Sequence, residues 1–119
     1  MAIPRVRSLQ GVDLRETVLV GADLTGANLA EAYLKGANLS KADLTGADLW
    51  RSSLTGANLT GANLKGADLL SAGLSEANLN GANMGGARCR DAKFDGSTYD
   101  DGTVFPARFN PARRGMRKA

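Results

Sequence analysis

Leucine recurs every five residues over most of the chain, in an unbroken series from Leu14 to Leu79. Four other apolar residues continue the series in phase: Met84, Cys89, Phe94 and Tyr99. Alanine usually stands two positions before each of these residues, aspartate or asparagine one position before, and glycine often two positions after. The chain therefore repeats the unit Ala-(Asp/Asn)-Leu-polar-Gly.

A period of five fits neither a helix nor a long strand. On an α-helix, successive leucines would lie about 140° apart and would form no apolar stripe. In a long strand, an odd period would send alternate leucines to opposite faces. The pattern fits a short extended segment, with Ala and Leu inward and Asp or Asn outward, followed by a corner that favours glycine. Each unit is expected to form one side of a closed coil.

Departures from the repeat indicate how many sides make one coil. Between residues 23 and 83, the Asp/Asn position is occupied differently only at Tyr33, Ser53 and Gly73. Between residues 25 and 85, the residue after leucine is Ala, Trp or Leu only at Ala30, Trp50 and Leu70. Within each set, successive members lie four repeat units apart. This spacing predicts four-sided coils in which each set stacks in one column.

Segments such as residues 21–29 (GADLTGANL) and 60–69 (TGANLKGADL) resemble the pentapeptide-repeat family. The resemblance covers about 18 units, from Val12 to Tyr99. It implies an all-β fold, a right-handed quadrilateral β-helix with small residues and Leu or Phe inside, here of about 4.5 coils. The segment that follows the repeats is similar to segments in some bacterial, notably cyanobacterial, members.

We expect three parts: an N-terminal cap over residues 1–11, the β-solenoid over 12–99, and a C-terminal cap with a basic tail over 100–119. Both ends of a solenoid expose backbone edges and apolar core, which must be covered. The apolar side chains available for this are Ile3, Val6, Leu9, Val104, Phe105, Phe109 and Met116. A homodimer contact at the C-terminal end is the alternative to a cap there.

The net charge of +3 is unevenly distributed. Residues 12–99 contain eight Lys and Arg against ten Asp and Glu, whereas residues 100–119 contain five against two. The body is thus nearly neutral, which argues against a nucleic-acid groove. The basic tail residues are expected to be solvated and partly disordered, with a contact to nucleic acid or acidic lipid as the alternative. They are Arg113, Arg114, Arg117 and Lys118.

The sequence predicts no catalytic residue, no cofactor and no metal site. It has no histidine, and its one cysteine, Cys89, falls at an inward position. Aspartates that lie four repeat units apart, such as Asp23 and Asp43, are expected to be solvated or bonded to corner backbone. The single cysteine and the lack of a long apolar run favour a cytoplasmic protein without a membrane span.

The departures from the repeat also predict an interaction surface with an apolar and aromatic centre. It comprises Ala30, Glu31, Tyr33, Trp50, Arg51, Ser53, Leu70, Ser71 and Gly73. Substitution drift at tolerant surface positions is the alternative interpretation of these residues.

A non-enzymatic binding or scaffold protein is the function that these features favour. Its partner would be a protein that the sequence does not identify, without a small-molecule substrate; a homodimer through the surface around Trp50 or through the C-terminal end is an alternative. The family resemblance adds a second function, because its quinolone-resistance members resemble duplex DNA and protect or inhibit DNA gyrase. The chain departs from that pattern, since Lys41, Lys65, Arg88 and Arg90 interrupt its acidic columns.

Overall fold

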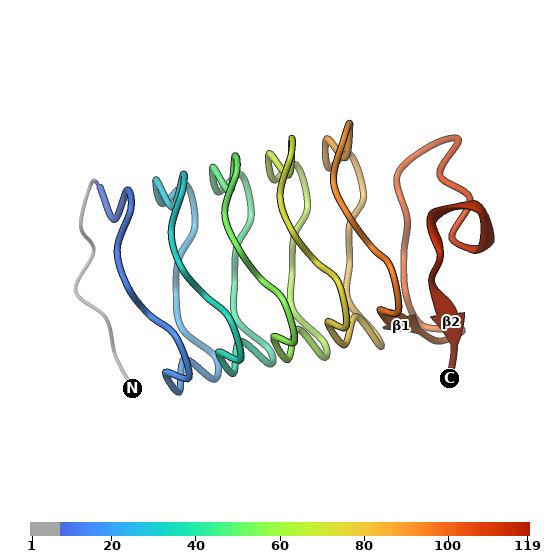
Figure 1. Cartoon of the computed structure of the whole chain (residues 1–119), viewed down its shortest axis with the longest axis horizontal. Coiled ribbons are helices and arrows are strands. Elements are labelled where there is room, and N and C mark those ends of the chain that lie inside the picture. Colours follow the sequence, from blue (N-terminus) through green and yellow to red (C-terminus); the bar gives the residue numbers. More distant parts are fainter. Residues whose placement is uncertain (1–7) are drawn as a thin grey trace.

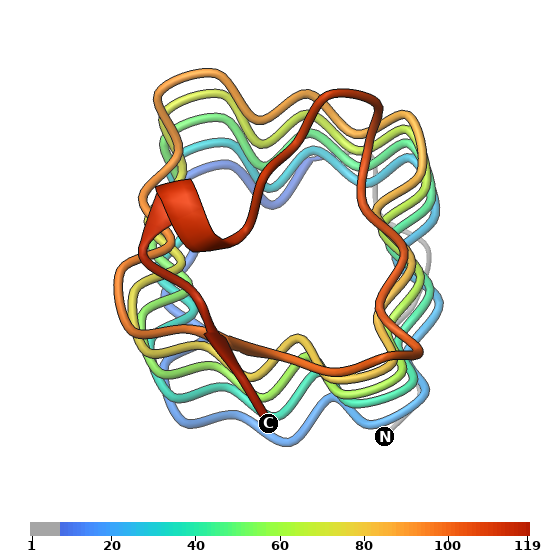
Figure 2. The same cartoon turned by 90° about the vertical axis from the view of Figure 1, so that its right-hand side faces the viewer.

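The computed structural model describes residues 8–119. Ile3 and Val6 of the expected N-terminal cap lie outside the described residues. The chain winds into a stack of similar coils (Figure 1), and the view along the stack has a four-sided outline (Figure 2). The chain turns counter-clockwise as it advances toward the viewer of Figure 2, which is the sense of a right-handed coil. The protein is an all-β solenoid.

Each side of a coil pairs with the neighbouring coils through a single parallel β-bridge. Asp48 bridges to Asn28 in the preceding coil and to Asp68 in the next. The Leu29 amide donates to the Asp48 carbonyl at 2.7 Å, and the Asp48 amide donates to the Ala27 carbonyl at 2.9 Å. The bridges keep this offset of four repeat units from Ser8–Asn28 to Asn78–Thr98. The predicted coil of four five-residue sides is confirmed.

The aspartate or asparagine of each unit stabilises the corner that follows it. Its side-chain oxygen accepts a hydrogen bond from the backbone amide two residues later, as between Asp68 and Leu70 at 2.9 Å or Asn58 and Thr60 at 3.0 Å. This geometry needs a short side chain with an acceptor oxygen, which explains the restriction to Asp and Asn. The predicted hydrogen bonding of these residues to corner backbone is confirmed.

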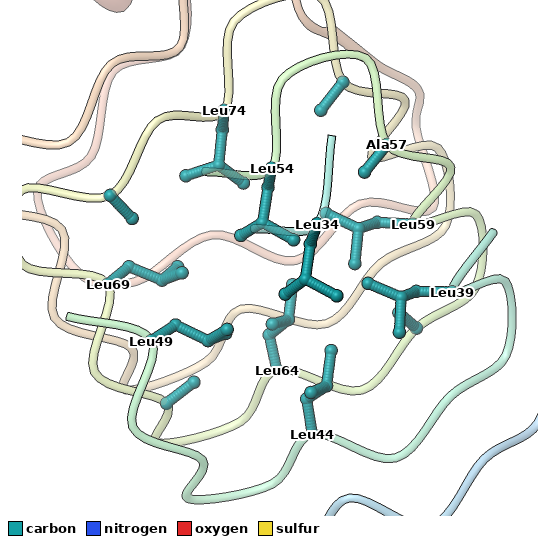
Figure 3. Close-up of a cluster of buried hydrophobic side chains, with 14 of the residues drawn as sticks. Leu34, Leu39, Leu44, Leu49, Leu54, Ala57, Leu59, Leu64, Leu69 and Leu74 are labelled. Atoms are coloured by element: carbon teal, nitrogen blue, oxygen red, sulfur yellow. The ribbon is translucent and has the colours of Figure 1, made fainter. Parts of the chain in front are cut away.

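The interior is filled by the leucine and alanine columns, which point inward from all four sides (Figure 3). Leu19 and every later leucine of the periodic series are buried. Met84, Cys89 and Phe94 are buried too, while Tyr99 is half-buried. Burying one leucine contributes about 1.5–3 kcal/mol, so these columns dominate the stabilisation of the solenoid. The inward phase predicted for the series is confirmed.

The pairing register changes in the last coil. The strand β1 (Thr98–Tyr99) pairs in parallel with β2 (Arg117–Lys118), and Thr98 lies opposite Arg117, one position short of the regular offset. Asn83 instead bridges to Val104, one position beyond the regular offset. The corner of residues 100–103 accommodates the extra residue, because Asp100 accepts hydrogen bonds from the amides of Gly81 and Gly102, both at 2.9 Å.

The C-terminal segment folds back across the end of the last coil (Figure 2). Phe109 packs edge-on against Phe94 at a centroid distance of 5.1 Å, and Met116 is buried. A short 3-10 helix, η1 (Ala112–Arg114), ends at Gly115. The expectation of a solvated, partly disordered tail is wrong for Arg114, which is half-buried and donates to the carbonyl of Cys89 at 2.7 Å. The backbone carbonyls of Cys89 and Ala92 attract its guanidinium.

Candidate interaction surface

The nine predicted surface residues follow one corner of the solenoid, and we call them together the Trp50 surface. Backbone hydrogen bonds stack this corner from coil to coil. The Glu31 amide donates to the Trp50 carbonyl at 2.7 Å, and the Arg51 amide donates to the Leu70 carbonyl at 3.0 Å. Trp50 therefore lies between Ala30 in the preceding coil and Leu70 in the next. The structure brings the predicted residues together in adjacent columns.

The apolar centre of the Trp50 surface is smaller than its sequence suggests. Trp50 is 37% exposed and Leu70 is half-buried, but Ala30 is buried, with only 5% of its surface exposed. The expectation of an exposed Ala30 is wrong, because its single methyl group does not extend beyond the backbone of its own corner. In this column, Trp50 and Leu70 provide the apolar area that a partner could contact.

Two contacts hold the Trp50 side of this centre in place. The Trp50 amide donates to Asp48 Oδ1 at 3.0 Å, which fixes the backbone from which the indole projects. The Arg51 guanidinium lies over the indole ring, 5.0 Å from its centroid, in a cation–π arrangement. The exposed ring is thereby partly ordered before any partner binds, which lowers the entropy lost on binding.

The second column of the surface consists of Tyr33, Ser53 and Gly73, which bridge to one another in successive coils. Tyr33 is 55% exposed, and the other two are half-buried. The side chains of this column therefore decrease in size along the solenoid axis, from the phenol of Tyr33 to no side chain at Gly73. The bridge from Gly73 continues to Lys93, which is exposed.

The corner of the Trp50 surface places residues other than glycine at left-handed positions. Four stacked corner residues other than glycine adopt left-handed conformations: Glu31 (φ 59°), Arg51 (φ 54°), Ser71 (φ 58°) and Asp91 (φ 60°). The remaining corner columns hold glycine at most of the equivalent positions. A left-handed conformation costs a residue with a side chain about 1–2 kcal/mol, and such strain clusters at functional sites. The side chains kept here are all polar or charged.

A pocket of about 480 Å³ lies at the C-terminal end of the same corner. The Ser71 amide donates to the Arg90 carbonyl at 3.0 Å, so Arg90 continues the column of Trp50 and Leu70. The residues that line the pocket include Cys89, Arg90, Asp91, Arg108, Phe109 and Arg114. The surface and the pocket are thus continuous along one corner.

Arg114 is held rigidly at this pocket. Its Nη2 donates to the carbonyls of Cys89 and Ala92, at 2.7 and 3.2 Å. Its guanidinium lies 5.2 Å from the Phe94 ring centroid and 4.8 Å from that of Phe109. The neighbouring Cys89 thiol is buried, and desolvation raises its pKa to about 11, so it stays protonated near neutral pH.

The predicted surface did not include Arg90, Lys93 or the pocket. Arg90 and Lys93 continue the two columns of departures at the same spacing of four repeat units, C-terminal to the stretch of regular units, so the sequence carries this signal. Val18 and Val20, which are 58% and 42% exposed on a different side, were not predicted as part of a surface either. Both valines stand at positions of the repeat unit that most other units fill with polar residues, in a unit that precedes residue 23.

The stacked aspartates are engaged in local contacts. Asp43 accepts hydrogen bonds from the Thr45 side chain and amide, and these bonds lower its pKa. Asp68 lies 3.6 Å from Arg88 in an ion pair. Within residues 8–119, no three potential metal ligands of the His, Cys, Asp or Glu types gather as a metal site would require. Over the same residues, no helix has the length and apolar character to cross a membrane.

Comparison with solved structures finds the same fold in several proteins. The pentapeptide repeat protein Rfr23 from the cyanobacterium Cyanothece 51142 is 38% identical over 79% of this chain, with a TM-score of 0.79. A pentapeptide repeat protein from the Arabidopsis thaliana thylakoid lumen is 33% identical over 79% of this chain, with a TM-score of 0.77. The match spans 64% of the first of these proteins and 66% of the second, less than two thirds of each.

QnrB1, a plasmid-mediated fluoroquinolone resistance protein, is 20% identical over 94% of this chain and 79% of its own, with a TM-score of 0.55. At that identity the likeness concerns the fold alone. No curated protein sequence gives a significant match. A model of pentapeptide repeats, in eight copies, matches residues 8–46, 37–72 and 72–98. With this match over most of its length and a coil of four five-residue sides, the chain belongs to the pentapeptide repeat family.

Proposed function

We propose that the chain is a non-enzymatic binding or scaffold protein that docks a protein partner on the Trp50 surface. The observation that carries the proposal is the exposed, partly ordered indole of Trp50 beside Leu70. A few aromatic anchors supply most of the binding energy of a typical interface. The polar corner residues around this centre correspond to the rim of such an interface.

The chemistry of the chain supports binding rather than catalysis. The sequence has no histidine, and the one cysteine is a buried thiol with a raised pKa. The aspartates of the sides accept hydrogen bonds from corner amides, which is a structural use of these groups. We therefore assign the chain no reaction.

Capping is the role that we propose for residues 100–119. Phe109 packs against Phe94, and Arg114 donates hydrogen bonds to two carbonyls of the last coil. Both contacts occupy the end of the solenoid at which a second copy would have to dock, which supports a cap over a homodimer contact there. The division into residues 1–11, 12–99 and 100–119, with about 4.5 coils, remains a prediction, since bridges extend from Ser8 to Val104.

A bacterial, cytoplasmic protein is still our prediction, although one similar protein comes from a thylakoid lumen. We do not propose a gyrase-directed function. The acidic columns of the body are interrupted by Lys and Arg, and Asp68 is paired with Arg88. A supercoiling assay with purified gyrase tests this directly, and we expect no effect at micromolar concentrations.

The proposal is tested with the double variant Trp50→Asp/Leu70→Ser. Both residues lie outside the core, so its melting temperature should stay close to that of the parent. Pull-down from host lysate should lose the partner. The matched control is Val18→Asp/Val20→Ser, which removes an exposed apolar pair from another side and should keep the partner.

Sedimentation over a concentration series separates a foreign partner from a second copy of the chain. A parent dimer that the Trp50→Asp/Leu70→Ser variant dissociates would identify self-association as the use of this surface. An unchanged pull-down profile and unchanged sedimentation would show that the Trp50 surface binds nothing and would refute the proposal.

A further inference from the structure

The pocket at the end of the Trp50 corner has an excess of positive charge. Arg90, Arg108 and Arg114 line it, with Asp91 as the one acidic residue among the lining side chains. Within the described part of the chain, none of the three arginines has a carboxylate partner within ion-pair distance. Three guanidinium groups at one pocket repel one another, and a bound anion would relieve that repulsion.

Arg114 is prepared to receive such an anion. Only its Nη2 takes part in hydrogen bonds within residues 8–119, and both of these go to backbone carbonyls. Its other guanidinium nitrogens keep donors for a ligand, and the Phe94 and Phe109 rings hold the group in place. Each of the remaining N–H groups, on Nε and Nη1, can donate a single charge-assisted hydrogen bond to a carboxylate. Arg90 and Arg108 are exposed and can close on the same ligand.

The pocket is aligned with the apolar centre of the Trp50 surface. Trp50, Leu70 and Arg90 occupy the same position in three successive coils, as the stacked corner hydrogen bonds show. Two coil spacings separate Trp50 from Arg90, which is about 10 Å. A segment in the polyproline II conformation advances about 3.1 Å per residue and has three residues per turn, so side chains three residues apart lie on one face and about 9 Å apart.

We propose that the pocket binds a side-chain carboxylate from a segment of the protein partner in the polyproline II conformation, with an apolar residue three positions away resting on Trp50 and Leu70. The inference rests on the proposed function and specifies the chemistry of the partner. Charge complementarity with the three arginines selects an acidic segment. The fixed spacing between the indole and the pocket sets its register.

The test is an NMR titration of the full-length ¹⁵N-labelled protein with short peptides. The probe is acetyl-Leu-Ser-Ser-Glu-amide, accompanied by its reversed sequence, because the direction of the segment is open. The matched control peptides replace Glu by Gln or Leu by Ala. With the Glu peptide in one direction, we expect shifts at the Arg90, Asp91 and Arg108 amides and at the Trp50 indole. The Gln and Ala peptides should each bind about tenfold more weakly or worse.

Variants show whether the arginines carry the binding. Arg90→Gln/Arg108→Gln should weaken the Glu peptide at least ~tenfold. Arg113→Gln, which removes an exposed arginine outside the pocket, should leave binding unchanged. The absence of shifts at Arg90 and Arg108 up to about 20 mM peptide, a range that detects millimolar affinity, would overturn the proposal. Equal binding of the Glu and Gln peptides would do the same.

Inorganic phosphate is titrated separately. If it binds at Arg90 and Arg108 more tightly than the Glu peptide does, the pocket is a small-anion site and the peptide proposal is wrong. The pull-down from lysate separates the proposed function of the Trp50 surface from the proposed role of the pocket. If Trp50→Asp/Leu70→Ser loses the partner but Arg90→Gln/Arg108→Gln retains it in full, the proposed function stands and the pocket assignment fails.

Discussion

Backbone strain at the corners can be measured by exchanging glycine and non-glycine residues between two columns. Gly46 has φ of +66°, and a Cβ added there would meet no atom within 4 Å. Ser71 has φ of 58° at the corner of the Trp50 surface, with an exposed side chain. The two positions differ in residue type but share a left-handed conformation, so Gly46→Ala and Ser71→Gly should have opposite effects on the free energy of unfolding.

The magnitude follows from two opposing terms. A left-handed conformation costs a residue with a Cβ about 1–2 kcal/mol. Glycine loses about 0.5–1 kcal/mol more conformational entropy on folding. The net change is about 0.5–1 kcal/mol, destabilising for Gly46→Ala and stabilising for Ser71→Gly. For a chain of this size it corresponds to a shift in melting temperature of roughly 2–6 °C.

Urea denaturation of the two single variants and of the double variant measures these changes. The two effects should nearly cancel in the double variant, since the residues lie on different corners and share no contact. Shifts of the same sign, or no shift in either single variant, would refute the assignment of strain to the left-handed corners. Gly66→Ala is the matched repeat of the first substitution, because its added Cβ would also meet open space.

Three further predictions concern the core, the cysteine and the acidic groups. Leu49→Asp should unfold or aggregate the protein, because an unpaired buried carboxylate costs several kcal/mol. Trp50→Asp, at the next residue, should melt close to the parent. If circular dichroism showed similar melting of both variants, the inward phase of the leucines would be contradicted. Cys89 should react with an aromatic disulfide reagent at pH 8 only after denaturation, since a pKa of about 11 leaves about 0.1% of the thiol as thiolate. Rapid labelling of the folded protein would contradict the burial of Cys89. The pKa of Asp100 is lowered, chiefly by the Gly81 amide, so its stabilisation is present above the unfolded pKa near 3.8 and is lost as the pH falls through the folded value. The melting temperature should therefore fall on acidification below about pH 4, and fall less in Asp100→Asn, which keeps an acceptor oxygen but does not titrate.

The solenoid could be predicted from the sequence because each of its determinants is local and repeated. A five-residue period excludes other regular structures, and departures spaced by four repeat units give the number of sides. The last coil could not be predicted in this way. The extra residue in the corner of residues 100–103 leaves no mark in a periodic pattern that has already ended at Tyr99, and the register change follows from the hydrogen bonds of Asp100.

The candidate site was predicted in its position but not in its shape. Column spacing located Trp50 and Leu70 on one corner, but whether a side chain reaches the surface depends on its length, which is why Ala30 is buried. The pocket depends on Arg114, which folds back onto Cys89 from a distant part of the chain. The number of charges in the tail does not predict that contact, because it depends on where the fold places the carbonyls of Cys89 and Ala92.

The uniform coil length has a consequence for how such a protein can change in size. Every coil up to Thr98 uses the same offset of four repeat units and bonds only to the coils beside it. Duplication of any four consecutive units between two equivalent corners would lengthen the stack by about 4.8 Å and leave each column in line. An insertion between Leu70 and Arg90 would move the arginine pocket away from the indole by that one step, so the spacing of the two contacts can be varied in fixed increments without altering either of them.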